Sequence, residues 1–372
     1  MPARNTGRMR ARGCRCPVEY PCVEGVEQDD MTHAKKIGFL SFGAWHPGGG
    51  LTRSAADALH QTVELAVAAE EIGIDGAFVR VHHFARQLAS PFPLLAAIGV
   101  KTSRIEIGTG VIDVRYENPL YMAETAAAAD LLAGGRLQLG ISRGSPEPAW
   151  RGAEAFGYSI DPDEAREKAR LFRAAVAGAG VVRADEGGRP GDTFLPVQPH
   201  SPGLADRIWW GSGSRETAVW AGENGYNLMS STLLLEDTQV PFDELQAEQI
   251  GLFREAWRKA NHEGEPRVSV SRSVMPITSD LDRQLFGSDR NEDQVGWLDG
   301  AISRFGRTYS GEPDRIAAEL AGDAAVQAAD TILLTVPSQL GVEYNAGLLE
   351  TIARDVAPAI GWAPRDLAAL TP

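Results

Sequence analysis

Two adjacent histidines close an apolar run and are the side chains in this sequence best suited to acid–base chemistry. His82 and His83 directly follow the run 78–81. An imidazole gains and loses its proton near neutral pH, so a histidine at a strand end can act as a base or as a proton donor. Because successive side chains of an extended strand point to opposite faces, at most one of the two would face a shared site. A packed, hydrogen-bonded histidine pair is the alternative interpretation.

A second polar group ends a later apolar run and is suited to binding an oxyanion. Ser142, Arg143 and Gly144 stand at the end of the run 137–142 and offer a hydroxyl, a guanidinium and a flexible backbone at one position. Arg166, further along the chain, is a candidate second cation because a guanidinium binds phosphate through parallel donors. A solvated helix face is the alternative for Arg166, which has acidic neighbours.

Small residues form a turn directly ahead of another predicted helix. Ser212, Gly213 and Ser214 permit close backbone approach, and Ser214 is a typical residue for the start of a helix. The unpaired amides of a helix N-terminus attract phosphate groups, so the turn indicates an anion site. An ordinary helix cap without a ligand is the alternative.

Alternating strand and helix patterns must position these residues. Each apolar run is followed by a segment with helical spacing or helix-start signals, and several runs are apolar throughout, which is typical of a parallel sheet covered on both faces. The eight predicted strands are 37–42, 75–81, 105–114, 137–142, 207–211, 226–230, 268–277 and 331–336. We predict an α/β fold, a closed (β/α)8 TIM barrel. An open doubly wound sheet is the rival, but no strand is followed by its Gly-x-Gly-x-x-Gly turn.

Two connections exceed the usual length and are predicted to be long insertions after strands 4 and 7. Segments 144–207 and 278–311 would extend loops at the catalytic face of a barrel, where long loops often act as lids. Trp45 and Phe84, at the ends of the first two strands, either line an apolar substrate pocket or pack at the barrel rim.

Composition bounds the class of protein. The 372 residues, 43% of them hydrophobic, can bury a large core, and the formal charge of -14 disfavours nucleic acid and anionic membranes. No apolar run reaches the roughly 20 residues needed to span a bilayer, so we expect a cytoplasmic location, no nucleic acid and no membrane. The three cysteines all precede residue 31 and lack metal-site spacing, so no metal is predicted. We predict a disordered extension over 1–31 and one barrel domain over 32–372.

The order of several short motifs resembles the bacterial luciferase-like family of flavin-dependent monooxygenases and deazaflavin-dependent oxidoreductases. The resemblance covers the chain from Lys36 to its carboxyl end, and the motifs are individually weak but specific in order and spacing. They are Val81-His82-His83-Phe84, Ile107-Gly108-Thr109-Gly110, Asn118-Pro119-Leu120, Gly134-Gly135-Arg136-Leu137 through Gly144, and Phe156-Gly157. The family is built on a (β/α)8 barrel, as the strand pattern predicts independently.

The resemblance implies a reduced flavin at the carboxyl-terminal mouth of the barrel. Its phosphate would be held by Arg143, Arg166 and the turn 212–214. The family often has a non-proline cis peptide beneath the flavin, which would fall near Gly110 and Val111. His82 matches a histidine proposed to assist oxygen chemistry, and Ser142 matches a position close to the flavin ring.

One departure from the family concerns the residue before the histidines, which is commonly glutamate and is Val81 here. Without that carboxylate, His82 lacks a neighbouring group that could orient its ring or raise its pKa. The resemblance implies a monooxygenase that uses oxygen and reduced FMN, supplied by a separate flavin reductase, to oxidise a small organic substrate. Hydride transfer with a deazaflavin coenzyme is one alternative, and a non-catalytic flavin-binding or partner protein is another. By analogy we expect a homodimer, with the alanine-rich segment 123–129 packing either within the barrel or between subunits.

Overall fold

The computed structural model describes residues 35–144, 151–236, 239–287, 292–298 and 301–364. The predicted extension 1–31 lies outside the described residues. Within the described part, no helix is both long enough and apolar enough to cross a membrane. No cluster of three or more His, Cys, Asp or Glu side chains that could hold a metal ion occurs there either.

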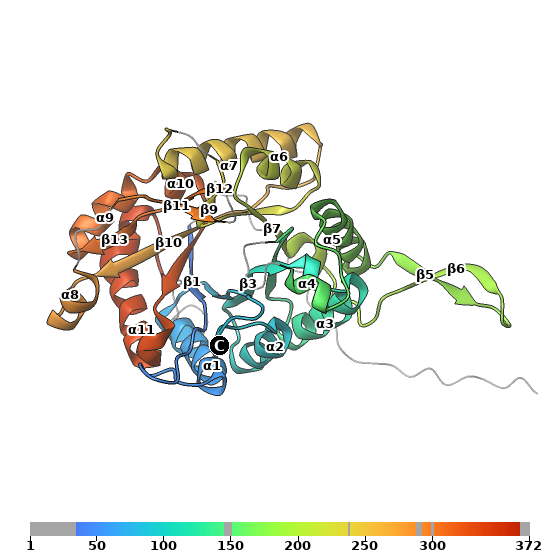
Figure 1. The fold of residues 1–372 in the computed structure, drawn as a ribbon, viewed down its shortest axis with the longest axis horizontal. Helices are drawn as coiled ribbons and strands as arrows, with labels where there is room; N and C mark the ends of the chain where they lie inside the picture. Colours follow the sequence, from blue (N-terminus) through green and yellow to red (C-terminus); the bar gives the residue numbers. More distant parts are fainter. Residues whose placement is uncertain (1–34, 145–150, 237–238, 288–291, 299–300, 365–372) are drawn as a thin grey trace, which may run out of the picture. The chain divides into compact units, whose positions relative to one another are not determined.

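Eight parallel strands close into a barrel, which confirms the predicted fold (Figure 1). Each strand pairs with the next along the chain, and the last strand pairs with the first, in register from Lys36 opposite Thr331 onward. The barrel strands are β1 Lys36–Ser41, β2 Gly76–Val79, β3 Glu106–Asp113, β4 Leu137–Ser142, β7 Ile208–Ser212, β8 Asn227–Ser230, β10 Val268–Pro276 and β14 Thr331–Val336.

Helices cover the outside of the barrel and connect successive strands. The first of them begins at Ser54, whose side chain accepts the N–H of Asp57 while Asp57 caps in return, and it ends at Gly73 with φ of 96°. The last begins at Gly341. The connecting helices are α1 Ala55–Ile72, α2 Pro91–Lys101, α3 Pro119–Leu132, α5 Pro162–Val176, α6 Arg215–Glu223, α7 Phe242–Lys259, α9 Pro313–Ala321, α10 Ala324–Ala328 and α11 Gly341–Thr351.

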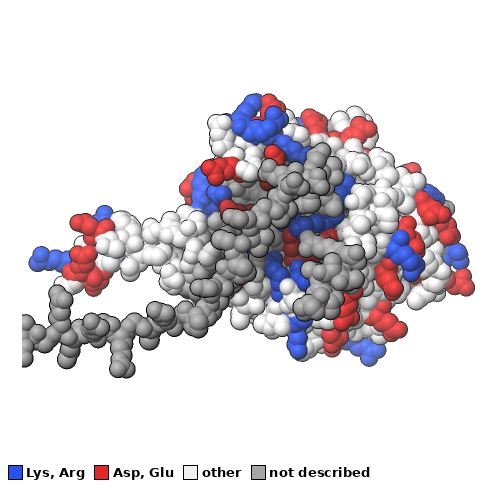
Figure 2. Space-filling view, turned by 180° about the vertical axis from the view of Figure 1, so that it is seen from behind, with Lys and Arg blue, Asp and Glu red and all other residues white. Residues whose placement is uncertain are grey.

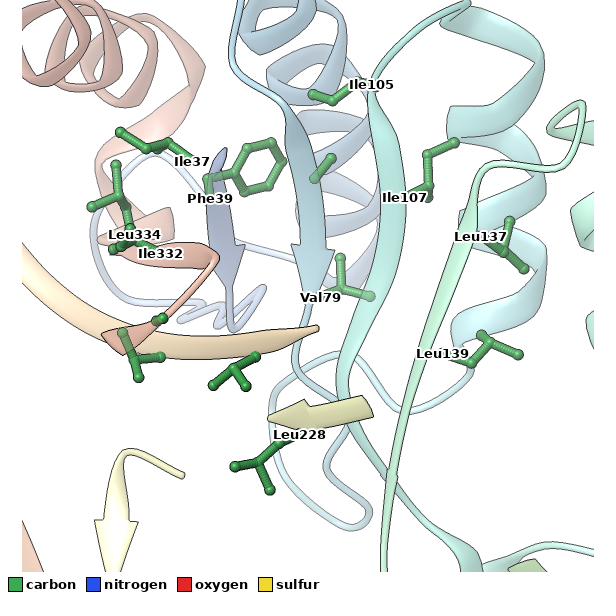
Figure 3. Packing of buried hydrophobic residues seen from close by; sticks show 14 of the residues in the cluster. Ile37, Phe39, Val79, Ile105, Ile107, Leu137, Leu139, Leu228, Ile332 and Leu334 are labelled. Atoms are coloured by element: carbon green, nitrogen blue, oxygen red, sulfur yellow. The ribbon is translucent and has the colours of Figure 1, made fainter. Parts of the chain in front are cut away.

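Alternation along the strands produces two apolar layers. Side chains such as Ile37, Ile107 and Leu139 belong to the large core between strands and helices, and Figure 3 shows them on β1, β3 and β4. The intervening positions supply a smaller cluster inside the barrel, formed by Leu40, Phe78, Trp209, Met229 and Leu333. This division follows from the period of two in a strand, which sends successive side chains to opposite faces.

Phe78 lies inside the barrel against two glycines, Gly76 on the same strand and Gly108 on the next strand. A Cβ atom added at Gly108 would lie 2.5 Å from Gln138 O and 2.6 Å from Phe78 Cδ1, and one at Gly76 would lie 2.6 Å from Phe78 Cε2. The size of Phe78 therefore requires glycine at both positions.

We expect Gly108→Ala to lower the free energy of unfolding by about 1 to 3 kcal/mol, because the added methyl group overpacks a filled interior. Gly251→Ala is the matched control, since Gly251 lies in α7 with no atom within 4 Å of its added Cβ. That change should raise stability by about 0.5 to 1 kcal/mol through helix propensity. Urea unfolding of the two variants measures both effects, and equal midpoints would contradict the packing argument.

The first insertion differs from the prediction that segment 144–207 extends a loop at the catalytic face. After α4 Gly152–Ala155 and α5, the chain forms an antiparallel hairpin of β5 Gly180–Asp185 and β6 Pro190–Pro196, which extends away from the barrel in Figure 1. The hairpin follows a helix and precedes strand β7, so it belongs to the amino-terminal ends of the strands, opposite the mouth. The prediction is wrong for this part because the sequence pattern showed one helix in the segment and missed the hairpin after it.

The second insertion lies at the mouth, as predicted. After β10 come α8 Asp280–Phe286, β11 Gln294–Leu298, β12 Ala301–Phe305 and β13 Thr308–Gly311. Strand β12 pairs with β9 Leu233–Leu234, a short strand that follows β8. The insertion therefore reaches the carboxyl end of a barrel strand, where a lid would have to lie.

Charged side chains are spread over the surface. Figure 2 shows acidic and basic side chains intermixed on the visible face, with no large area of one sign among the described residues there.

Candidate active site

A pocket opens at the carboxyl ends of the barrel strands and encloses about 620 Å³, counting the part open to solvent. We call it the mouth pocket. It brings together five residues that the sequence predicts for cofactor binding: Gly110, Val111, Ser142, Ser212 and Gly213. The other lining residues are Leu40, Arg80, Gly144, Gly211, Met229, Ser230, Ser231, Thr232, Leu233, Leu235 and Ser271.

Two glycines in the lining of the mouth pocket are packed closely against neighbouring residues. A Cβ added at Gly110 would lie 3.0 Å from Leu40 Cδ1 and 3.0 Å from Arg80 Cδ, and one at Gly211 would lie 2.6 Å from Val111 Cγ1. Leu40, Val111 and Met229 also give the floor an apolar surface. An apolar floor with few side chains standing on it suits a flat ring system.

Hydroxyl groups supply much of the polar lining, and their neighbours fix several of them. Ser212 Oγ lies 2.7 Å from Thr217 Oγ1, and Ser230 Oγ accepts a hydrogen bond of 2.9 Å from Gln246 Nε2. Ser142 Oγ accepts the backbone N–H of Gly144 at 3.3 Å. The hydroxyls therefore stand in set positions at the ends of β4, β7 and β8.

Ser214 begins helix α6 directly beside the mouth pocket. Its side chain accepts the N–H of Thr217, and Thr217 caps in return, so the serine is the N-cap of α6. The next residue, Arg215, donates its backbone N–H to the Glu236 carboxylate at 3.3 Å. The N-terminus of α6 thus already attracts an anionic group.

Arg143 and Arg166 meet at one carboxylate, and we call these two residues with Glu216 the arginine cluster. Arg166 forms an ion pair with Glu216, and the Arg143 guanidinium lies 4.0 Å from the other oxygen of the same carboxylate. The hydrogen bond from Arg166 lowers the pKa of Glu216 below its usual value, against a smaller opposing effect of burial. Arg166 is only 17% exposed and its guanidinium lies 5.4 Å from the Trp220 ring centre, so the solvated-face alternative for Arg166 is wrong.

The two histidines lie beyond their strand rather than on it. Strand β2 ends at Val79, and the chain turns at Phe84 with a φ of 58°, so the strand alternation expected for His82 and His83 does not apply. His82 is half-buried, donates its backbone N–H to Leu88 O at 2.9 Å and stacks on Phe42 with ring centres 6.4 Å apart. It is not among the residues that line the mouth pocket.

His83 and its neighbours form a packed aromatic cluster. The buried His83 ring stacks on Tyr116 with centres 4.1 Å apart, and Phe156 contacts both rings edge-on. Phe84 contacts Phe156 at 6.0 Å, and Trp45 lies under the Arg86 guanidinium. The His83 ring is therefore packed, whereas Phe84 is 56% exposed.

The peptide bond between Gly110 and Val111 differs from the expectation of a cis bond. Among the described residues the cis peptide is Gln198–Pro199, so the predicted cis bond is wrong for this chain. The irregularity at this point of β3 is instead a register shift, in which Thr109 pairs with Leu139 and Ile112 with Ile141. One extra residue on β3 is thereby accommodated as a β-bulge, a common device beside active sites.

A group of charged residues next to Gly144, which lines the mouth pocket, was missed by sequence reasoning. Asp113, at the end of β3, accepts hydrogen bonds of 3.0 and 2.6 Å from Arg115 Nε and Nη2, and Lys168 donates to Arg115 O. Burial raises the pKa of Glu117 to about 7, with Lys168 opposing the rise and Asp113 adding to it. Asp113, Arg115 and Glu117 are close together in the sequence, directly after the apolar part of β3, whereas Lys168 comes from α5, so the complete group exists only in the folded chain.

Glu117 predicts a pH-dependent stability. A carboxyl with a raised folded pKa stabilises the fold when protonated, below its unfolded pKa of 4.5, and this contribution is lost as pH rises through about 7. We expect the free energy of unfolding of Glu117→Gln to exceed that of the wild type at pH 8.5 by up to about 3 kcal/mol, with a higher unfolding temperature, and to match it at pH 4. Thermal melts at both pH values check this, and a constant difference across pH would count against it.

Comparison with known proteins places the chain among enzymes with this barrel. The family model described as luciferase-like monooxygenase matches residues 37–284. The oxygenase component of a flavin-dependent trigonelline monooxygenase from Acinetobacter baylyi is 25% identical over 245 residues, which are 62% of this chain and 63% of that protein. An F420-dependent glucose-6-phosphate dehydrogenase from Kribbella flavida is 30% identical over 178 residues, 46% of this chain and 52% of the relative. The chain thus spans about half to two thirds of these relatives.

A solved structure supports the same placement at the level of the fold. The monooxygenase RslO1 from Streptomyces bottropensis superposes with a TM-score of 0.65 at 20% identity, covering 87% of this chain and 99% of that one. Together with the family match over residues 37–284, the barrel and its mouth pocket lead to one conclusion. This chain belongs to the luciferase-like monooxygenase family.

Proposed function

We propose that this protein is the oxygenase part of a flavin-dependent monooxygenase that binds reduced FMN from a separate reductase and oxidises a small organic substrate with molecular oxygen. The observation that carries the proposal is the arginine cluster beside the mouth pocket, where Arg143 and Arg166 converge on one carboxylate. The carboxylates of Glu216 and Glu236 are both bound at the start of α6, one by Arg166 and one by the backbone N–H of Arg215. This part of the chain therefore has the donors and positive charge that bind an anion. A cofactor phosphate fits that chemistry.

The remaining parts of the cofactor fit the mouth pocket. Gly110 and Gly211 place no side chain in its lining, and Ser142 and Ser212 offer hydroxyls there. Bound reduced flavin would supply the electrons for oxygen chemistry. The protein would hold and orient the ring, and the insertion after β10 would exclude water. His82, two residues after the pocket-lining Arg80, is our candidate for moving a proton.

A deazaflavin-dependent hydride transfer is a second candidate, and Glu216 favours it. The carboxylate reduces the charge of the two arginines to a net single positive charge. If Glu216 stays beside the arginines when a ligand binds, such a site matches a singly charged phosphodiester more closely than a doubly charged phosphate. The relative from Kribbella flavida is described as F420-dependent.

Anaerobic calorimetric titration separates the two candidates. Purified protein is titrated with reduced FMN, with reduced riboflavin as a control without phosphate, and with the reduced deazaflavin coenzyme. Tighter binding of reduced FMN, followed by oxygen consumption, supports the monooxygenase. Tighter binding of the reduced deazaflavin coenzyme supports hydride transfer instead. A protein that binds none of the three ligands overturns both candidate functions.

We also propose a homodimer through helix α3. The alanines 123, 126, 127 and 129 are buried within the chain, so the alanine-rich segment packs inside the barrel shell. The outer face of α3 instead exposes Tyr121, Leu131 and Leu132, at 66%, 49% and 58%, which is a large apolar area for a surface helix.

Substituting Leu131 and Leu132 together by aspartate should convert the dimer into a monomer, because two charges in an apolar interface are costly to desolvate. Light scattering coupled to size-exclusion chromatography measures the mass. The same double substitution at Leu281 and Leu285, exposed on α8, is the control and should leave the mass unchanged. A wild type that elutes as a monomer at high concentration would disprove the dimer.

A further inference from the structure

A second, smaller cavity lies at the carboxyl-terminal end of the barrel, between helices α1 and α11. These helices lie side by side in Figure 1, and Ser41 ends strand β1 while Ser338 follows strand β14. The cavity encloses about 260 Å³, counting the part open to solvent, and we call it the rim cavity. None of its lining residues also lines the mouth pocket. The lining consists of Ser41, Thr52, Ala58, Gln61, Thr62, Leu65, Ser338, Gly341, Val342 and Asn345.

Three oxygen atoms of the rim cavity lie together with few hydrogens between them. Thr52 Oγ1 is 2.7 Å from Gln61 Oε1 and 2.8 Å from Ser338 O. A threonine hydroxyl has one hydrogen, so it can point to only one of these two acceptors at a time. Ser338 O already accepts the backbone N–H of Gly341. When the Thr52 hydrogen points to Gln61, the lone pairs of Thr52 Oγ1 therefore face those of Ser338 O.

Asn345 adds an oxygen atom without a partner. The residue is 1% exposed, and its Oδ1 has no hydrogen-bond partner among the described residues. Its Nδ2 donates to Pro337 O at 3.1 Å and to Gly341 O at 2.7 Å, which sets the orientation of the amide. Gln61 is oriented in the same way, because its Nε2 donates to Leu51 O at 3.1 Å. Both amides thus use their N–H donors elsewhere and keep their oxygen atoms for the cavity that the two residues line.

We propose that the rim cavity binds a monovalent alkali cation. Its ligands would be Thr52 Oγ1, Gln61 Oε1, Ser338 O and Asn345 Oδ1. Hard cations take oxygen ligands, and carbonyl oxygens replace the hydration shell of K⁺ in proteins. The described lining contains no carboxylate, so it could not balance the two charges of a divalent ion. A bound ion would join the segment before α1 to the segment between β14 and α11.

The first test is the dependence of stability on potassium. Thermal unfolding of the full chain is measured from about 0.1 to 100 mM KCl, because a ligand of the folded state stabilises it once its concentration exceeds the dissociation constant. Choline chloride keeps the ionic strength constant. We expect the unfolding temperature of the wild type to rise with potassium. A water molecule bound to the same oxygens does not respond to the exchange of choline for potassium, so a constant unfolding temperature overturns the proposal.

Two substitutions change the site in opposite directions. Thr52→Val removes one ligand at nearly constant side-chain size and should weaken potassium binding by about 10-fold. Gln61→Glu should strengthen it by about 10-fold, because it places a negative charge beside the ion. A gain of this kind does not arise from damaged packing, so it tests the proposal even where Thr52→Val is unstable. Thr125→Val is the matched control, since Thr125 Oγ1 donates to Tyr121 O on α3 and does not line the rim cavity.

Rubidium locates the ion directly. Crystals of the full chain are grown with RbCl in place of KCl, and an anomalous difference peak in the rim cavity beside Thr52 and Asn345 supports the proposal. A map without a peak there overturns it, as does a potassium dependence that is the same in Thr52→Val as in the wild type and Thr125→Val. These measurements involve no flavin, so their outcome is independent of the proposed function.

Discussion

Arg166→Ala should weaken the binding of reduced FMN by about 10- to 100-fold and leave the binding of reduced riboflavin almost unchanged. The guanidinium of Arg166 is largely buried, stacks on Trp220 and points to the Glu216 carboxylate, where we place the cofactor phosphate. Riboflavin has no phosphate, so the ratio of the two affinities isolates the contribution of the arginine. Anaerobic calorimetry measures both constants.

A matched control for this prediction lies one turn further along α5. Arg170 also contacts the Trp220 ring, at 5.5 Å, but it pairs with Glu167 and Asn224 rather than with Glu216. Arg170→Ala should leave the FMN affinity within about twofold. Glu216→Gln should tighten FMN binding, because it removes a negative charge that competes for the same arginines. Equal effects of Arg166→Ala on FMN and riboflavin would place the phosphate elsewhere.

Asp323→Ala should lower the free energy of unfolding by about 3 to 5 kcal/mol, because it leaves a buried guanidinium without its partner. Asp323 accepts hydrogen bonds of 2.7 and 2.9 Å from Arg272 Nε and Nη2, and one from the Tyr309 hydroxyl. Both members of the ion pair are at most 3% exposed. Burial alone would raise the pKa of Asp323, but the hydrogen bonds and charge of Arg272 hold it below its usual value.

The sign of the pH effect follows from that lowered pKa. The ion pair stabilises the fold above the unfolded pKa of the aspartate and loses its contribution as pH falls through the folded pKa. Denaturant unfolding at pH 7 gives the main effect, and the wild type and Asp323→Ala should converge in stability in strong acid. Asp280→Ala is the control, since the exposed Asp280–Arg283 pair should contribute little. A loss as small for Asp323→Ala as for Asp280→Ala would contradict the argument.

The barrel could be predicted because its signals are local. Every predicted strand overlaps a barrel strand, and α1 is bounded by an N-cap at Ser54 and a C-cap at Gly73. The spacing of apolar residues and the residues that cap helices are local features of the sequence. They can therefore be recognised without knowing the fold. The hairpin after α5 was missed, because its short strands have many exposed positions and lack an apolar run.

The amino-acid sequence by itself determined the barrel and the resemblance to a family. It also identified Arg143 and Arg166 as candidate phosphate-binding residues. Only the tertiary structure showed that Arg143 and Arg166 share Glu216, that Arg80 rather than His82 lines the mouth pocket, and that His83 is packed. The physical reason is that these contacts join residues from different strands and helices. Closing the barrel brings the ends of all eight strands to one mouth, and side-chain contacts between neighbouring ends exist only after that closure.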